Sequence, residues 1–133
     1  MNGLTLTELE AYRDARGWNT HPLDEESLRA GAYANLHLVS MEPGAIRGNH
    51  KHAMQTEEVV IIGGPCLFTA QDTATGECFE RVFRPGELFH IFIRPGIAHA
   101  FKNIGESTAY LLCASGLMFD PEAPDTERVP LLD

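Results

Sequence analysis

Short segments in which apolar residues run together or alternate with polar ones fill the chain from residue 32 onward. Pro and Gly residues separate these segments, as expected where turns join strands. Near the start of this region, Ala34, Leu36 and Leu38 alternate with Tyr33, Asn35 and His37, which is typical of a half-buried strand. Further strands are expected at 59–62, 67–71, 78–84, 88–93, 98–102 and 110–114. About eight short strands at this spacing predict an all-β fold, either a barrel or a jelly roll.

Residues 1–31 carry a different pattern, which predicts a helical extension before the strands. Thr7 and Glu10 have the spacing of a capping box, and Gly17 supplies a stop signal. Leu6, Leu9 and Tyr12 recur every three residues. The pattern therefore predicts a short helix over residues 7–16, and residues 24–30 predict another turn of helix.

Length and composition favour one ordinary globular domain. The 133 residues are 44% hydrophobic, and no apolar run approaches the roughly 20 residues that span a bilayer. The first ten residues lack the basic start and apolar core of a secretory signal. We therefore expect one cytoplasmic domain over residues 1–133 with no membrane partner.

Charge and cysteine content exclude two further classes. A formal net charge of −9 repels phosphate backbones, so nucleic acid is not expected as a partner. Cys66, Cys78 and Cys113 are odd in number and have no C-x-x-C spacing. Free thiols are therefore expected in place of a disulfide framework or a zinc knuckle.

Candidate metal ligands gather in the stretch from residue 44 to residue 64. His50 and His52 are separated by one residue, and alternate side chains of a strand share one face. Glu57 opens the next apolar run after a turn, which places it on the adjacent antiparallel strand, and His99 offers a third imidazole downstream. Three imidazoles and one carboxylate suit one divalent transition-metal ion, such as zinc, iron, nickel or manganese. His37 is interpreted as a strand histidine and not as a ligand.

The same stretch resembles the first motif of the cupin superfamily, G-x5-H-x-H-x4-E-x6-G. The matching positions are Gly44, His50, His52, Glu57 and Gly64. The second cupin motif corresponds to Gly86, Gly96, His99 and Asn103, with two extra residues after Gly86 and Arg94 in place of the first proline. The resemblance implies a cupin fold, a double-stranded β-helix or jelly-roll barrel, over residues 32–116. Residues 117–133, rich in Pro and acidic residues, would follow as a strap.

A narrower resemblance covers roughly residues 32–126. It rests on Arg47-Gly-Asn-His50, on Pro95-Gly96 with His99, and on the tail from Phe119 to Thr126. These segments together look like the cupin that forms the C-terminal domain of capsular-polysaccharide nucleotide-sugar reductases and also stands alone in polysaccharide biosynthesis. Arg-Gly-x-His is also similar to the dTDP-4-dehydrorhamnose 3,5-epimerases and the dTDP-sugar 3,4-ketoisomerases. The presence of Glu57 and His99 favours the metal-binding branch.

Three further residues are candidates for substrate chemistry. In the epimerases the arginine of Arg-Gly-x-His handles the nucleotide-sugar, which implies that Arg47 binds a substrate phosphate. Ordinary strand parity would place Arg47 opposite the histidines, and only a bulge at Gly48 would turn it inward; otherwise it is a surface ion-pair residue. His90 and Tyr110 lie in predicted strands and could supply acid–base catalysis.

The leading hypothesis is a metal-dependent cupin that moves protons on a nucleotide-linked keto-sugar, as an epimerase or isomerase does. A small-molecule substrate, a sugar or nucleotide-sugar, is the expected partner. The alternatives are an iron dioxygenase and a non-catalytic sugar-binding or regulatory cupin. The segments 59–62 and 88–93 are apolar on both faces, and small cupins commonly pair, so a homodimer is expected as well.

Overall fold

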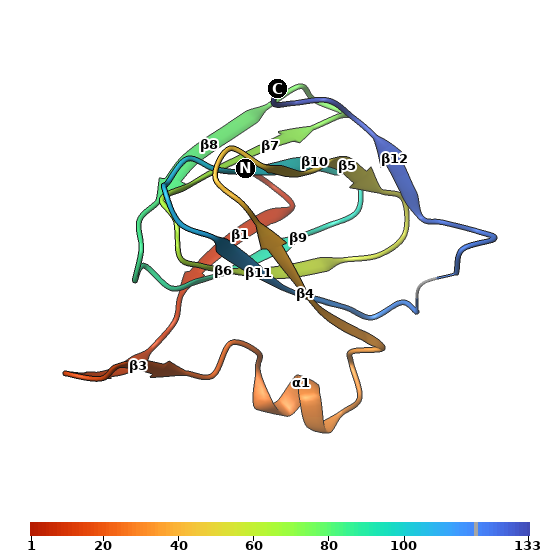
Figure 1. Ribbon diagram of the computed structural model, residues 1–133. Coiled ribbons are helices and arrows are strands. Elements are labelled where there is room, and N and C mark those ends of the chain that lie inside the picture. The colour runs from red at the N-terminus through yellow and green to blue at the C-terminus, as the bar shows by residue number, and fades with distance from the viewer. Residues whose placement is uncertain (119) are drawn as a thin grey trace.

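The computed structural model describes residues 1–118 and 120–133, and nearly all of its regular structure is β (Figure 1). Two five-stranded sheets form the upper and lower layers of Figure 1. The lower sheet has the order β1-β9-β6-β11-β4 and the upper sheet the order β12-β5-β10-β7-β8. The lower strands are β1 (Leu4–Glu8), β9 (Phe89–Ile93), β6 (Glu57–Ile62), β11 (Ala109–Ser115) and β4 (Asn35–Met41). The upper strands are β12 (Thr126–Arg128), β5 (Ile46–His52), β10 (Ile97–Asn103), β7 (Cys66–Asp72) and β8 (Cys78–Phe83).

The hydrophobic core lies between the two sheets. Phe68, Phe83 and Phe101 of the upper sheet and Ile91 and Ile93 of the lower sheet are at most 2% exposed. Large aromatic and branched side chains from facing sheets fill the space between them, as in other two-layer β folds. The predicted all-β class is confirmed, and the arrangement is consistent with the predicted jelly roll.

The helix predicted over residues 7–16 is wrong. Residues 4–8 form β1, which pairs with β9 from Leu4 opposite Ile93 to Glu8 opposite Phe89. The next residues form a hairpin of β2 (Ala11–Asp14) and β3 (Gly17–Thr20). A ladder of hydrogen bonds to a strand more than eighty residues away outweighs the local helical pattern, because short isolated helices are marginal in water.

The turn of helix predicted over residues 24–30 is confirmed as α1 (Glu25–Arg29). Asp24 is its N-cap, with an extended backbone, and its carboxylate accepts a hydrogen bond from the Ser27 amide at 3.0 Å. The helix lies below the lower sheet in Figure 1. The N-terminal segment therefore covers part of that sheet's outer face, where Leu9 and Leu23 line a cavity together with His90.

The side of β4 that carries Leu36 and Leu38 faces outward. Leu36 and Leu38 are 59% and 69% exposed, whereas Met41 is fully buried. Val39 packs against the core on the same side as Met41, so strand alternation turns Asn35 and His37 inward as well. The two-sided apolar runs at 59–62 and 88–93 are mostly buried instead, with Val60 only 3% exposed. The most exposed apolar side chains of this sheet therefore lie on its edge strand β4. They do not lie on the segments 59–62 and 88–93, from which the homodimer was expected.

In the part of the chain that the structure describes, no helix has both the length and the apolar character needed to cross a bilayer. Cys66, Cys78 and Cys113 are all free thiols, as expected. Burial raises the pKa of the Cys66 thiol to about 12, so Cys66 behaves as a small core residue.

Candidate metal centre

The four predicted metal ligands come together between the two sheets. His50 and His52 project from β5, and His99 projects from the neighbouring strand β10, where it lies directly opposite His50. Glu57 is the first residue of β6 in the other sheet. One potential ligand atom from each of the four residues lies within 4.8 Å of the other three. The residue spacing in the sequence therefore predicted the cluster correctly.

A bulge in β5 makes the pairing of His50 with His99 compatible with the rest of the strand. Beyond that pair, Ala100 lies opposite Gly48, so Asn49 is an extra residue in β5. Gly48 has a φ of 87°, and a Cβ built there would lie 2.7 Å from the carbonyl oxygen of His99. Only glycine tolerates both the backbone angle and this close approach. The bulge named above as the condition for turning Arg47 inward is thus present.

The three imidazoles converge on one oxygen. The Nε2 atoms of His52, His99 and His50 lie 2.8, 3.0 and 3.8 Å from Glu57 Oε2. Four ligands held at about 2.0–2.2 Å by a tetrahedral ion are separated by roughly 3.3–3.6 Å. The separations from Glu57 Oε2 bracket that range, and all four ligand atoms lie within 4.8 Å of one another, so side-chain shifts would fit the cluster to one zinc-like ion.

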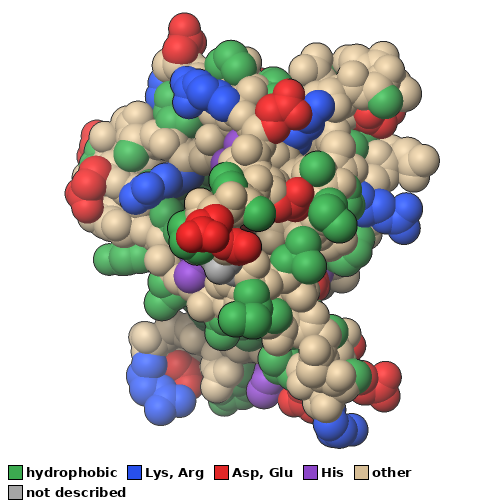
Figure 2. Space-filling model, turned by 90° about the vertical axis from the view of Figure 1, so that its right-hand side faces the viewer, with side chains coloured by type: hydrophobic (Ala, Val, Ile, Leu, Met, Phe, Trp, Pro, Cys, Tyr) green, Lys and Arg blue, Asp and Glu red, His purple; other side chains and the backbone are tan. Residues whose placement is uncertain are grey.

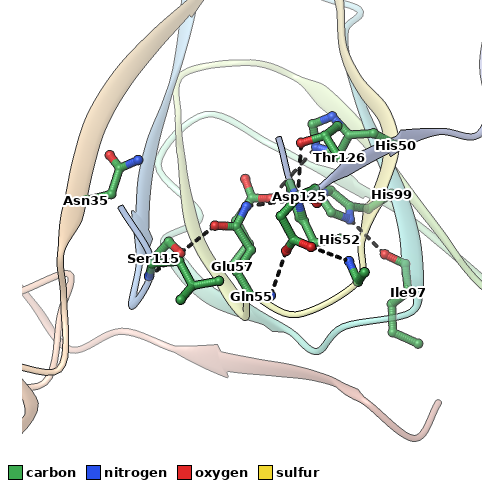
Figure 3. A network of polar contacts seen from close by, with 12 residues as sticks. Asn35, His50, His52, Gln55, Glu57, Ile97, His99, Ser115, Asp125 and Thr126 are labelled. Atoms are coloured by element: carbon green, nitrogen blue, oxygen red, sulfur yellow. Dashed lines mark hydrogen bonds and ion pairs between the residues drawn. The ribbon is translucent and has the colours of Figure 1, made fainter. Parts of the chain in front are cut away.

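The other ring nitrogens of two histidines have partners of their own. His99 Nδ1 donates to the carbonyl oxygen of Ile97 at 3.0 Å, and His52 Nδ1 lies 2.9 Å from the carbonyl oxygen of Asp125 (Figure 3). A metal-bound histidine usually donates its second ring N–H to such an oxygen, which orients the ring and leaves Nε2 free for the ion. The surroundings of the cluster therefore suit metal ligation through Nε2.

The electrostatics of the cluster favour a charged carboxylate. Burial alone would raise the pKa of Glu57, but hydrogen bonds from His50, His52 and His99 outweigh it and hold that pKa well below its usual value. Burial alone would lower the pKa of His52, and the contact with Glu57 raises it instead. The buried Cys113 thiol lies beside Glu57, and burial followed by this neighbouring charge raises its pKa to about 12. Cys113 is therefore a neutral thiol in the wall of the site.

A cavity of about 600 Å³ opens from the ligands to solvent. One wall belongs to the strap, residues 117–133, and this face is turned to the viewer in Figure 2, where hydrophobic and acidic side chains lie beside one another. Met54 and Met118 at the cavity are 77% and 80% exposed. Phe119 of the predicted tail motif lies outside the described residues. The lining residues are Asn35, His37, His50, His52, Met54, Gln55, Glu57, Cys113, Ala114, Ser115, Leu117, Met118, Asp120, Ala123, Pro124, Asp125 and Thr126.

The structure does not bring His90 or Tyr110 to this cavity. His90 lies on the outer face of the lower sheet, where its Nε2 is 2.7 Å from Glu58 Oε1, and the Tyr33 hydroxyl donates to the same oxygen at 2.9 Å. Tyr110 is 45% exposed. Ile91 beside His90 is buried, as are Ala109 and Leu111 on either side of Tyr110, so alternation turns His90 and Tyr110 away from the core. The prediction of acid–base roles for these two residues at the metal centre is corrected accordingly.

Arg47 lies opposite Phe101 in the register of β5 and β10. The bulge places it on the side of the sheet that carries Phe101, since residues opposite each other in an antiparallel pair share a face. Its guanidinium is nevertheless exposed and donates from Nε and Nη2 to the carbonyl oxygen of Ser40, at 3.1 and 3.0 Å. Arg47 is not among the residues that line the cavity, so its binding of a substrate phosphate stays a prediction.

Sequence reasoning missed several residues that contact the ligands or face the cavity. The sequence pattern predicts a strand histidine with no role in the site at His37, yet it lines the cavity from β4. The side-chain amide of Gln55 lies 2.8 Å from His52 Nδ1, and its Oε1 accepts a hydrogen bond from Ser115 at 2.8 Å. Val39 and Met41, apolar and in phase with His37, were the available signal for His37. No local pattern indicates that Asp125 returns to His52.

Comparison with known proteins places this architecture in a family. The family model described as "Polysaccharide biosynthesis C-terminal domain" matches residues 12–127. A UDP-2-acetamido-2,6-beta-L-arabino-hexul-4-ose reductase of Pseudomonas aeruginosa is 29% identical over 102 residues, which are 76% of this chain and 27% of the reductase. The chain thus spans about a quarter of that relative's length.

Two solved structures share the fold over nearly the whole chain. A dTDP sugar isomerase from Desulfovibrio desulfuricans superposes with a TM-score of 0.82 and 18% identity, covering 97% of this chain and 85% of that one. ChmJ, a 3'-monoepimerase from Streptomyces bikiniensis in complex with dTDP-quinovose, gives a TM-score of 0.81 and 20% identity, covering 98% and 71%. Because the family model matches most of this chain, residues 12–127, the chain belongs to the polysaccharide biosynthesis C-terminal domain family, and it has a cupin fold.

Proposed function

We propose that this protein is a metal-dependent cupin that moves a proton next to the carbonyl of a nucleotide-linked keto-sugar, as epimerases and isomerases do. The observation that carries the proposal is that His50, His52 and Glu57 line a cavity of about 600 Å³, with the buried His99 clustered beside them. That volume falls in the range of small-molecule sites, about 300–1,000 Å³. It therefore leaves room for a sugar ring beside the ion.

His50, His52, Glu57 and His99 would hold the ion, and their three nitrogens and one oxygen suit zinc, iron, nickel or manganese. A bound divalent ion supplies Lewis-acid polarisation of a substrate carbonyl, which makes the neighbouring C–H more acidic. Glu57 would be ionised for this role, because its pKa is held low by the three histidines.

His37 is our candidate for the group that accepts the proton. It lines the same cavity, and on the lower sheet it lies directly opposite Cys113, whose thiol neighbours Glu57. An imidazole is suited to general acid–base work near neutral pH. In this proposal His37 takes over the role that sequence reasoning had given to His90 and Tyr110.

The phosphates of the substrate would lie outside the cavity. None of the lining residues that the structure describes is Lys or Arg, whereas Asp120 and Asp125 are among them. An anionic diphosphate would meet repulsion beside these carboxylates. The exposed Arg47 on β5 remains the candidate phosphate ligand, and binding would require its guanidinium to leave the carbonyl oxygen of Ser40.

The names of the structural neighbours agree in kind with this proposal, since they include a dTDP sugar isomerase and a monoepimerase bound to dTDP-quinovose.

The outward apolar face of β4 also supports a homodimer. Leu36, Leu38 and the neighbouring Tyr110 are 59%, 69% and 45% exposed on one edge of the lower sheet. A second copy packed on this face would remove their apolar surface from water.

The experiment that tests the proposed reaction is solvent deuterium incorporation. Zinc-loaded protein is incubated in D₂O with a nucleotide-linked 4-keto-sugar, and mass spectrometry follows the exchange of the carbon-bound proton next to the carbonyl. Exchange should require metal, should be lost in His52→Ala, and should fall by about 10²–10⁴-fold in a metal-loaded His37→Gln variant. Tight binding of the nucleotide-sugar without exchange would favour a binding protein. Oxygen consumption by the iron-loaded protein would favour a dioxygenase.

A further inference from the structure

Asp125, in the strap, holds the loop between β5 and β6. Its carboxylate accepts hydrogen bonds from the main-chain amides of three consecutive residues: Ala53 at 3.2 Å, Met54 at 3.0 and 3.1 Å, and Gln55 at 2.8 Å (Figure 3). These are three of the four residues, 53–56, that connect His52 to Glu57. One side chain from the far end of the chain therefore sets the course of the segment that joins two ligands.

The main chain of Asp125 contacts one of those ligands directly. Its carbonyl oxygen lies 2.9 Å from His52 Nδ1, and the next residue, Thr126, lies opposite His52 where β12 pairs with β5. When Nε2 binds an ion, the proton of a neutral imidazole must sit on Nδ1. The carbonyl oxygen of Asp125 is placed to accept a hydrogen bond from that Nδ1–H group.

We propose that Asp125 is a positioning residue for the metal centre. Its side chain and its carbonyl oxygen act together: the carboxylate fixes the strap against the loop, and this contact holds the carbonyl oxygen against His52 Nδ1. The ring of His52 is thereby kept in the tautomer and orientation that present Nε2 to the ion. This inference rests on the proposed metal site and adds the strap to it.

In this proposal the strap helps the protein to bind the metal ion, in addition to forming a wall of the cavity. Asp125 also fixes the backbone of Gln55, whose Oε1 accepts a hydrogen bond from Ser115 and whose amide nitrogen lies 2.8 Å from His52 Nδ1. Both that nitrogen and a protonated Nδ1 are donors, so in the proposed tautomer Nδ1–H donates to Asp125 and the Gln55 amide must turn aside. A change that releases Asp125 from the loop should therefore weaken metal binding as well. Removal of the second hydrogen-bond partner of a metal ligand typically weakens metal binding by about 10–100-fold.

The chain offers a matched control two residues away. Glu127 is also a strap carboxylate, but it is an exposed partner of Lys51 at 3.6 Å on the outer side of β12. Glu127→Gln removes the same charge from the strap without touching the loop. Asp125→Asn keeps the size of the side chain but replaces one acceptor oxygen by a donor, which opposes the loop amides.

The test measures zinc affinity by competition with a chromophoric chelator, and amide hydrogen exchange at residues 53–55, in wild type, Asp125→Asn, Asp125→Ala and Glu127→Gln. Both Asp125 variants should bind zinc about 10–100-fold more weakly and exchange these amides faster, while Glu127→Gln matches wild type. Faster exchange with unchanged zinc affinity would overturn the inference, because Asp125 would then serve the loop alone. An equal loss in Glu127→Gln would overturn it too, by pointing to net charge. Wild-type protein that binds no zinc would refute the metal site itself, and this inference with it.

Discussion

His99 Nε2 on β10 lies 3.0 Å from Glu57 Oε2 on β6, and these strands belong to different sheets. His99 is fully buried, and the Glu57 side chain is 14% exposed. The contact therefore closes the inner end of the cavity by joining the upper layer to the lower one. Because His99 and Glu57 also hold the two sheets together, substitutions in the cluster can change folding as well as binding. Each binding measurement on such a variant therefore needs a measurement of folding beside it.

Replacement of His52 by Ala should abolish stoichiometric metal binding. Wild-type protein is expected to carry about one transition-metal ion per chain, and loss of one of four ligands leaves an incomplete site. Plasma emission spectrometry of the purified proteins measures this, with His21→Ala as a control because the exposed imidazole of His21 lies far from the cluster. Full metal occupancy in His52→Ala would contradict the assignment of the ligands.

The metal-free protein should lose stability as pH rises above neutrality. The pKa of His52 is raised above its ordinary value of 6.5. The stabilising contact of protonated His52 with Glu57 is therefore complete below pH 6.5 and is lost as pH rises through the folded-state pKa. The pKa of Glu57 is lowered from 4.5, so its contribution is present above pH 4.5 and is lost in acid.

Thermal unfolding in the presence of a chelator, followed from mildly acidic to alkaline pH, measures this effect. The decline in Tm should be flatter in Glu57→Gln, which has no charge to pair with His52. Added zinc should show the opposite trend and stabilise more as pH rises, since its ligands must be deprotonated. A metal-free Tm that climbs steadily above pH 6.5 would count against the contact.

Loss of the Arg47 side chain should weaken binding of a nucleotide-sugar by roughly tenfold to a hundredfold, which corresponds to about 1.5–3 kcal/mol for charge-assisted hydrogen bonds. Metal content should stay unchanged, because the ligands lie elsewhere. Calorimetry of wild type and Arg47→Ala with the nucleotide-sugar and with the free sugar distinguishes the contribution of the phosphates to the affinity from that of the sugar. Arg29→Ala, at the end of α1, is the control. Equal affinities for the nucleotide-sugar would make Arg47 an ordinary surface residue that binds Ser40.

A charge on the outer face of β4 should disrupt the proposed dimer. Leu38 is 69% exposed, and a glutamate at this position would be costly to bury against a second copy. Light scattering at micromolar concentration should show a dimer for wild type and a monomer for Leu38→Glu. Val82→Glu, at a 45% exposed position on β8, should stay dimeric. A monomer-sized mass for wild type would refute dimerisation.

Local patterns predicted the metal cluster because its geometry depends on short spacings. His50 and His52 share a face through strand alternation, and the turn after them brings Glu57 back on the next strand. The bulge that pairs His50 with His99 was also predictable, since Gly48 accepts a backbone angle that other residues avoid. The family resemblance added His99 at its proper distance in the chain.

Amino-acid pattern thus predicted the all-β class and the turn of helix at α1, and together with the family resemblance it predicted the cluster of three histidines and Glu57. Tertiary structure decided the rest, because pairing with distant strands outweighs local preference. Residues 4–8 form β1 because they hydrogen-bond to β9. His90 and Tyr110 face outward because their neighbours in the strands fill the core. His37 faces the cavity because it alternates in phase with the buried Met41. Asp125 meets His52 across 73 residues, and only the folded chain brings them together.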